Sequence, residues 1–314
     1  MRAAAIDRFG PPSTLTLHQL PVPQPGPGEV LIAIDTAGVG VWDASIRDGS
    51  WRKPGRARFP LVPGVDGAGV IAATGARVRR LRVGDKVYAY EFGNRQGGFY
   101  AEFTAAAAAH VGRVPAGLRL RDAGAVAVTG LTALQGLDAL RLRSRETVLI
   151  FGATGAVGTI AVQLAVHRGA HVIATATGTA ATRLVRRLGA HRVIDARDDE
   201  STDRLRKYAP DGLDAVLAFA GGKELERCLD FVRPRGRVVH PNGIEPEPQK
   251  RRTLSVRSYD AIASPSAFAR LNRHLARRPF RVPIAASYPL AAAARAHRRL
   301  DRGRVLGRII LRVQ

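Results

Sequence analysis

The sequence predicts an α/β protein with two domains. Its 314 residues are enough to form two hydrophobic cores. Residues 117–254 alternate helical and strand patterns, which is typical of a doubly wound parallel sheet. Residues 1–116 instead show short strands separated by proline and glycine. A glycine-rich turn follows a buried strand near the middle of the chain, which places a strand–turn–helix unit there rather than at the start.

The first part of the chain is rich in turn signals. Prolines and glycines cluster at Pro11-Pro12, Pro21–Gly28 and Phe59–Gly64, and such clusters punctuate short strands. Glu29–Ile34 lies between them and has the pattern of a strand. These features predict a β-rich domain over residues 1–116.

The middle and the end of the chain differ from this pattern. Five strands of a parallel sheet are expected at residues 148–151, 171–176, 192–195, 215–219 and 236–240. The tail, residues 255–314, is expected to contain a helix at Ser266–Arg278, a proline-bounded link, an alanine-rich helix and a last strand at Gly307–Val313. We expect this last strand to return to the first domain.

The glycine turn carries the most specific signal. Val148–Phe151 forms the expected strand, and an apolar helical pattern begins at Thr159. Glycines let backbone N–H groups approach phosphate oxygens, and a helix N-terminus offers unpaired donors and a partial positive charge. Because the spacing is G-x-x-G-x-x-G rather than G-x-G-x-x-G, helix packing is the alternative explanation. The pattern predicts a Rossmann dinucleotide-binding domain, with its glycines at Gly152, Gly155 and Gly158 and its phosphate turn formed by Gly152, Ala153, Thr154, Gly155, Ala156 and Val157.

The second strand of this domain bears on the choice of cofactor. An NAD site usually carries an acidic residue at the end of that strand to hold the ribose 2′-hydroxyl, yet residues 147–194 contain no acidic residue. The strand instead ends near Thr175 and Thr177, and Arg183 follows on a helix. Hydroxyls and a guanidinium suit a 2′-phosphate. We therefore predict NADPH as the cofactor, bound through these three residues.

Composition excludes several classes of protein. The formal net charge is +23, which suggests nucleic-acid binding, but five of the 49 basic residues are lysines and the arginines are spread along the chain. We therefore expect no specific nucleic-acid partner. No apolar run reaches the length of a membrane span. A single cysteine, Cys228, rules out an internal disulfide, and a cytoplasmic location is expected.

An ordered set of motifs extends along nearly the whole chain. It includes Pro25–Val30, Ala37–Val39, Pro60–Val70, Val83–Val87, Gly98–Glu102, Thr129–Ala133, the glycine turn, Leu188–Ala190 and Gly307–Ile310. Through this set the chain resembles the zinc-independent quinone oxidoreductases of the medium-chain dehydrogenase/reductase superfamily. The resemblance implies a GroES-like catalytic domain built from residues 1–116 and 255–314, a Rossmann domain over 117–254, and a homodimer.

The resemblance also implies further cofactor contacts. Thr129 corresponds to a family threonine near the pyrophosphate and nicotinamide. The end of the fourth strand and two later positions correspond to family contacts with the nicotinamide side of the cofactor. The residues concerned are Phe219, Ala220, Gly221, Asn242, Gly243 and Arg308.

The catalytic groups are less well defined. One cysteine excludes a thiolate zinc cluster, and the eight histidines show no ligand spacing, so we expect no metal. The family commonly has Asn after Ala-Gly-Val, whereas this chain has Gly40. Trp42 and Tyr90 are weak candidates for the catalytic site. Core packing is the alternative for both, as it is for the tyrosines at 88 and 100. Asp43 is expected to cap a short helix at 44–47.

These features predict an NADPH-dependent, zinc-independent oxidoreductase that transfers hydride to a quinone or an α,β-unsaturated carbonyl. A short-chain reductase is disfavoured because the sequence contains no Tyr-x-x-x-Lys. The alternative is a non-catalytic protein with the same fold that senses NADPH or binds RNA. The β-like run Thr253–Arg257 is expected to be an edge strand that pairs with its copy in the homodimer.

Overall fold

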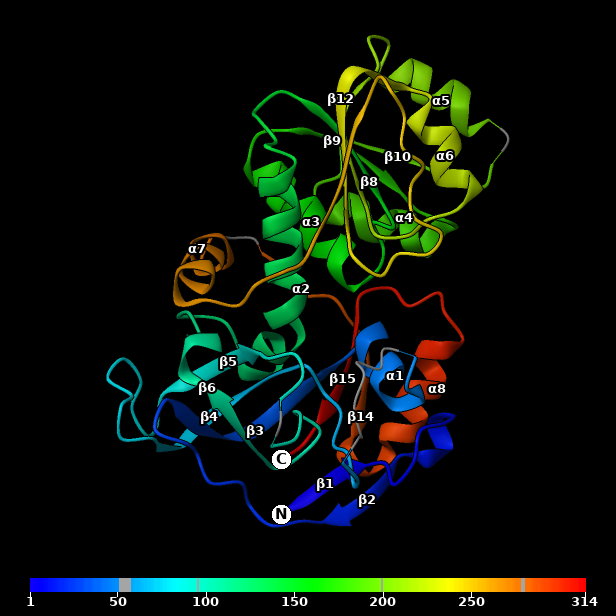
Figure 1. Ribbon diagram of the computed structural model, residues 1–314. Helices are drawn as coiled ribbons and strands as arrows, with labels where there is room; N and C mark the ends of the chain where they lie inside the picture. The colour runs from blue at the N-terminus through cyan, green and yellow to red at the C-terminus, as the bar shows by residue number, and fades with distance from the viewer. Residues whose placement is uncertain (51–57, 95, 199, 278–279) are drawn as a thin grey trace. The chain divides into compact units, whose positions relative to one another are not determined.

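Two compact units make up the chain in a computed structural model (Figure 1). The structure describes residues 1–50, 58–94, 96–198, 200–277 and 280–314. The first unit comprises Met1–Val128, Ala263–Arg278 and Ile284–Gln314, and the second comprises Thr129–Ile262 and Pro279–Pro283.

The first unit is built on a mixed sheet of order β14-β15-β3-β4-β5-β7, with β6 paired to β3, and on a separate β1-β2 hairpin. The alternating strand β3 is central because it hydrogen-bonds to β4, β6 and β15. The strands are β1 (Arg2–Ala5), β2 (Thr16–Gln19), β3 (Glu29–Val39), β4 (Asp66–Thr74), β5 (Lys86–Tyr90), β6 (Phe103–Ala107), β7 (Val111–Arg113), β14 (Ile284–Pro289) and β15 (Arg308–Arg312).

Short helices complete this unit. Ser264 caps helix α7 by accepting a hydrogen bond from the Ala267 amide, and proline occupies the first turn, where it suits helix geometry. The helices are α1 (Val41–Asp48), α7 (Pro265–Leu275) and α8 (Ala293–Asp301), with 3₁₀ turns η1 (Pro12–Thr14), η2 (Ala108–His110) and η3 (Leu290–Ala292).

The second unit contains a six-stranded parallel sheet of order β10-β9-β8-β11-β12-β13. Helix α3 lies on one side and helices α5 and α6 on the other (Figure 1). The strands are β8 (Thr147–Phe151), β9 (His171–Thr175), β10 (Arg192–Ile194), β11 (Leu213–Ala218), β12 (Val232–Pro241) and β13 (Ser255–Tyr259), and the helices are α3 (Ala156–His167), α4 (Thr179–Arg187), α5 (Ser201–Tyr208) and α6 (Lys223–Leu229).

This strand order is that of a dinucleotide-binding fold, in which the strand order reverses beside the first strand. That first strand is β8, and the predicted glycine turn follows it directly. The predicted α/β fold class and all five predicted strands of the parallel sheet are therefore confirmed.

The unit boundaries differ from those expected. Helix α2 (Leu120–Ala139) runs across the predicted boundary without a break, and the division falls after Val128. At the other end, β13 hydrogen-bonds to β12 in the parallel sheet, so the second unit extends to Ile262 rather than ending at residue 254.

The structure also corrects two local expectations. The proline-bounded link in the tail contains strand β14, which pairs in parallel with β15. The helix expected at 44–47 begins at Val41, with Gly40 at its N-cap, so Asp43 is the third helical residue and not the cap. The last strand does return to the first unit, because β15 pairs antiparallel with β3.

Candidate functional site

The glycine turn adopts a shape that only small residues allow. Gly152 has φ of +78°, a left-handed conformation that favours glycine. A Cβ at Gly158 would lie 2.6 Å from the Cα of Ala153 and would also strike the Gly152 carbonyl oxygen. Gly152 therefore makes the turn, and Gly158 lets helix α3 pack closely against it.

Gly155 leaves the start of helix α3 open. It is the N-cap residue, and no side chain caps the helix there. A Cβ on Gly155 would meet no neighbour closer than 3.6 Å. The first N–H groups of α3 are therefore available for a phosphate, which helix N-termini bind through these donors and the helix dipole. The predicted phosphate-turn residues fit a dinucleotide pyrophosphate.

Two predicted cofactor segments lie beside this turn. Thr175 is 8% exposed, and its Oγ1 accepts a hydrogen bond of 2.9 Å from the Gly152 amide. The Phe219 amide donates to the Phe151 carbonyl at 2.9 Å, so Phe219, Ala220 and Gly221 follow β11 next to the end of β8. A close approach of Gly221 to Pro246 leaves no room for a side chain at 221. Thr175 thus holds the turn, and its contact with a 2′-phosphate stays a prediction.

The structure brings an acidic residue to the predicted 2′-phosphate position. The Thr177 hydroxyl donates to Asp195 Oδ1 at 2.9 Å, and the Arg197 amide donates to the same oxygen at 3.1 Å. Arg183 is exposed on helix α4. Sequence reasoning missed Asp195 because it follows the third strand, while the search for an acidic residue covered the end of the second.

The remaining predicted residues of this unit differ in burial: Gly243 is exposed, Asn242 is half-buried and Thr129 is buried. Asn242 donates its side-chain amide to Asp260 Oδ2 at 2.8 Å, and Gly243 has φ of +84°. Both lie just beyond β12, at the edge where parallel strands end and ligands bind. Thr129 is 1% exposed in helix α2. Direct contact of these three residues with a cofactor stays a prediction.

Arg308 lies in a buried ion pair of the first unit. Its Nη2 is 2.6 Å from Asp66 Oδ1, and the two residues are 6% and 0% exposed. The second carboxylate oxygen of Asp66 accepts the Val128 amide at 3.1 Å. Burial raises the pKa of Asp66, and the guanidinium of Arg308 opposes that rise. The charge of Arg308 is therefore already partly neutralised by a carboxylate.

Asp43 fixes the turn between β3 and α1. Its Oδ2 accepts the Gly40 amide at 2.7 Å, and its Oδ1 accepts the Val65 amide at 3.0 Å. Burial raises the pKa of Asp43 to about 7, against the opposing effect of Arg308. This carboxyl is thus a turn-holding group whose two oxygens are both bonded to backbone amides.

A buried hydrogen-bonded chain extends from this turn. Arg47 Nη1 donates to His297 Nδ1 at 3.0 Å, so the proton of the imidazole is on Nε2, which lies 3.1 Å from the Tyr100 hydroxyl. The charge of Asp43 adds to the effect of burial in raising the pKa of Tyr100 well above its usual value. Burial, with the charge of Arg47, lowers the pKa of His297 to about 3, so the ring is neutral. Sequence reasoning missed Arg47 and His297 because each, taken alone, resembles a surface residue.

The weak catalytic candidates are packed. Trp42 is half-buried, and its ring lies edge-on to Phe92 with centroids 5.8 Å apart. Tyr90 is half-buried at the end of β5. Tyr88 is fully buried, donates to Asn272 Oδ1 at 2.6 Å, and has its pKa raised by burial. Tyr88 and Tyr100 are therefore core residues, while the roles of Trp42 and Tyr90 stay predictions.

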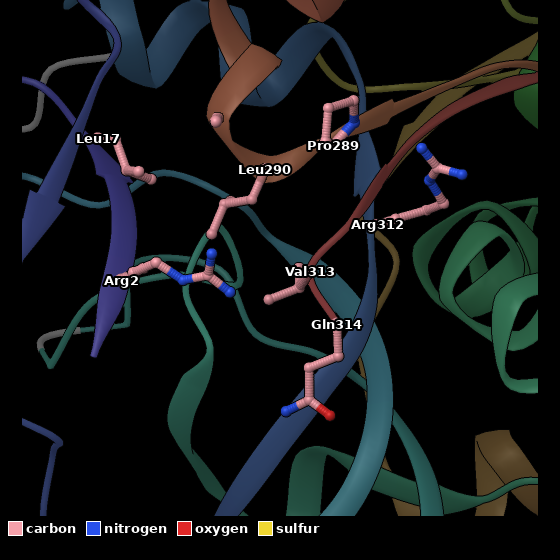
Figure 2. Close-up of a pocket in the computed structure, with 8 residues that line it drawn as sticks. Arg2, Leu17, Pro289, Leu290, Arg312, Val313 and Gln314 are labelled. Atoms are coloured by element: carbon pink, nitrogen blue, oxygen red, sulfur yellow. The ribbon is translucent and has the colours of Figure 1, made fainter.

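A surface pocket lies away from these residues. It has a volume of about 310 Å³, and Figure 2 shows Arg2, Leu290 and Val313 pointing toward a common space near the chain termini. None of the predicted site residues lines it. Within the described ranges, no cluster of three or more His, Cys, Asp or Glu could hold a metal ion, and no helix is long and apolar enough to cross a membrane.

Comparison with known proteins shows the family to which the chain belongs. Residues 26–116 match the alcohol dehydrogenase GroES-like domain, and residues 156–257 match the zinc-binding dehydrogenase family. A quinone oxidoreductase from Lama guanicoe is 31% identical over 326 residues, which covers 99% of this chain and 97% of the relative. The chain belongs to the medium-chain dehydrogenase/reductase superfamily.

Other members of the superfamily are similar over much or all of the chain. An alcohol dehydrogenase from Rhizobium meliloti (strain 1021) is 32% identical over 76% of each chain. Among solved structures, an NAD-dependent alcohol dehydrogenase has a TM-score of 0.92 at 28% identity, covering 100% of both chains. A mycobacterial protein complexed with NADPH has a TM-score of 0.88 at 27% identity, again covering 100% of both. The predicted resemblance and the GroES-like and Rossmann domains are therefore confirmed, and the chain is an oxidoreductase of this superfamily.

Proposed function

We propose that this medium-chain oxidoreductase uses NADPH, without zinc, to reduce a quinone or an α,β-unsaturated carbonyl compound. The proposal rests mainly on the glycine turn at the end of β8, the strand beside which the order of the parallel sheet reverses. Gly152, Gly155 and Gly158 each contribute to the geometry of a phosphate-binding turn. When bound, the nicotinamide would supply a hydride.

The residues of the second unit would hold this cofactor at two places. The open N-terminus of α3 would bind the pyrophosphate through backbone donors, and Thr177 with Arg183 would bind the 2′-phosphate. The solved relative with NADPH supports this choice. Asp195 accepts a hydrogen bond from Thr177, and its negative charge would repel a bound 2′-phosphate.

The proposed substrates need no metal to be activated. A quinone or an enone already has an electron-poor carbon, so the protein must mainly position it and stabilise charge on its oxygen. The quinone oxidoreductase relatives, two of which match at 31% identity, support this class of acceptor.

We further propose a homodimer. Strand β13 is the last strand of the parallel sheet, and its residues are half-buried or exposed. An unpaired strand edge of this kind can pair with a second copy. A monomer in sedimentation experiments at micromolar concentration would contradict the proposal.

Cofactor binding is the first test of the proposed function. We expect the purified protein to change the fluorescence of NADPH on titration, with weaker binding of NADH because it lacks the 2′-phosphate. If neither nicotinamide binds at millimolar concentration, the proposed function is wrong.

A further inference from the structure

Four arginines lie on one face of helix α8 and its C-cap. Arg298, Arg299 and Arg302 follow Arg295 at intervals of three, four and seven residues, the spacing that places side chains on one side of a helix. Together with Tyr288 of β14 they line a surface pocket of about 290 Å³, which we call the arginine pocket. None of the described residues that line it is acidic. The first unit therefore has a concave, strongly positive surface at this place.

Neighbouring carboxylates do not neutralise the arginine pocket. Asp301 is the one acidic residue of α8, and its Oδ2 lies 3.4 Å from Arg47 Nη1. The side chains of Arg298 and Arg302 form no hydrogen bond or ion pair with any residue that the structure describes. Helix α5, in contrast, pairs two of its arginines with carboxylates one turn away. Like charges at these spacings destabilise a helix, so a bound anion would relieve a repulsion that the protein itself leaves in place.

Two of the four guanidinium groups are held in position. Arg295 lies over the ring of Tyr288, 5.9 Å from its centroid, in a cation–π contact. The helix dipole favours cations in the last turn of a helix and disfavours them near its start, where Arg295 is the third residue. Arg299 donates to the carbonyls of Gly303 and Arg304 at 2.8 Å and 3.2 Å, in a turn where both residues have positive φ. Helix energetics alone therefore do not account for this arrangement.

We propose that the arginine pocket binds the polyphosphate group of a small molecule, a diphosphate or triphosphate. Planar guanidinium groups match phosphate oxygens with two parallel hydrogen bonds. The four arginines extend over seven residues of helix, about 10 Å, and linked phosphates carry several negative charges over a similarly short length. A concave pocket also suits a compact anion better than an extended nucleic-acid backbone. This site uses no residue of the glycine turn, so the proposal does not depend on the proposed function.

Calorimetric titration with inorganic tripolyphosphate tests this site. We expect the full chain to bind it with a micromolar Kd at about 0.15 M ionic strength, and to bind monophosphate at least tenfold more weakly. R298Q/R302Q should weaken the binding of tripolyphosphate at least tenfold. Both arginines are exposed or half-buried, and glutamine suits a helix, so this variant should fold. ATP serves as a second probe: an equal Kd would identify the phosphates alone as the ligand, and a lower Kd would identify a nucleotide, both in support of the proposal.

The matched control is R77Q/R121Q. Both are exposed arginines of the first unit, and their replacement lowers the net charge by the same amount. If the control weakens binding as much as R298Q/R302Q, the anion is attracted by the basic protein in general and the proposal is overturned. Unchanged binding in R298Q/R302Q would place the anion elsewhere, and no binding to wild type at millimolar tripolyphosphate would also contradict the proposal. A short RNA that binds through these arginines and is not displaced by tripolyphosphate would assign the face to nucleic acid instead.

Chemical modification gives a second readout that needs no variant. Phenylglyoxal modifies accessible arginines, and peptide mass spectrometry reports the rate at each position. Bound tripolyphosphate should slow the modification of Arg298 and Arg302 at least fivefold and leave Arg77 and Arg121 unchanged. Equal rates with and without the anion would overturn the proposal. Neither readout uses NADPH or a hydride acceptor, so the arginine pocket and the proposed function can each fail without the other.

Discussion

At the scale of single residues, the choice between NADPH and NADH depends on opposing charges near Thr177. Arg183 on α4 is exposed and available to a 2′-phosphate, whereas Asp195 accepts the Thr177 hydroxyl. A phosphate favours the first charge and is repelled by the second. The proposed preference for NADPH therefore depends on the balance between these two side chains.

Two substitutions should move this preference in opposite directions. We expect R183A to lower the ratio of NADH Kd to NADPH Kd about tenfold, because about 1.4 kcal/mol of a charge-assisted contact is lost. D195N should raise the ratio about fivefold, the equivalent of roughly 1 kcal/mol of repulsion. The measurement is fluorescence titration with both cofactors. R187A removes another exposed arginine of the same helix and is the control, and an equal effect of R187A would contradict the assignment of Arg183.

His297 gives the protein a pH-dependent term in its stability. Its pKa is about 3 in the folded protein against a usual 6.5. The folded protein therefore favours the neutral ring, and the free energy of unfolding is unaffected by this group above pH 6.5. As pH falls from 6.5 toward 3, the free energy of unfolding decreases by up to about 1.4 kcal/mol per pH unit, because the unfolded chain binds a proton at His297 and the folded protein does not.

The variant H297Q should remove this dependence. Glutamine can accept from Arg47 and donate to Tyr100 as the neutral ring does, but it does not titrate. The excess free energy of unfolding of wild type over H297Q should shrink as pH falls from 7 to 4, measured by denaturant titration. A difference that stays constant over this range would show that His297 does not titrate as described.

At the scale of elements, the glycine turn should be intolerant of one added carbon. G158A places a Cβ against the backbone of Gly152 and Ala153, which cannot move without opening the turn. We expect a loss of about 1–3 kcal/mol in the free energy of unfolding, and weaker NADPH binding. G28A is the control, because a Cβ at Gly28 meets nothing within 4 Å, and unchanged stability and binding in G158A would contradict the packing role of Gly158.

Elements defined by local pattern could be predicted from the sequence. The five strands of the parallel sheet and the glycine turn follow from apolar runs and glycine spacing, which are short-range signals. Strand β14 could not be recognised, because prolines flank it and its partner β15 lies about 20 residues later in the chain. Helix α1 begins earlier than expected: Gly40 is its N-cap, and the Asp43 carboxylate at the third helical position accepts the Gly40 amide.

The candidate site could be predicted only where its residues form a local sequence pattern. The phosphate turn is contiguous, so the sequence contains its whole pattern. In contrast, the contact of Arg308 with Asp66 joins two different strands, and the contact of Thr177 with Asp195 joins residues that follow two different strands. Only the fold brings them together, and no single-residue signal marks them in advance.

At the scale of the whole molecule, turnover is the measurement that tests the proposed function most directly. NADPH absorbance should be followed with a quinone and with a 2-alkenal supplied in turn, and each assay repeated with NADH. We expect oxidation of NADPH with at least one acceptor, and slower oxidation of NADH. Tight NADPH binding with no oxidation by any quinone or enone would contradict it and would favour a non-catalytic, cofactor-sensing protein.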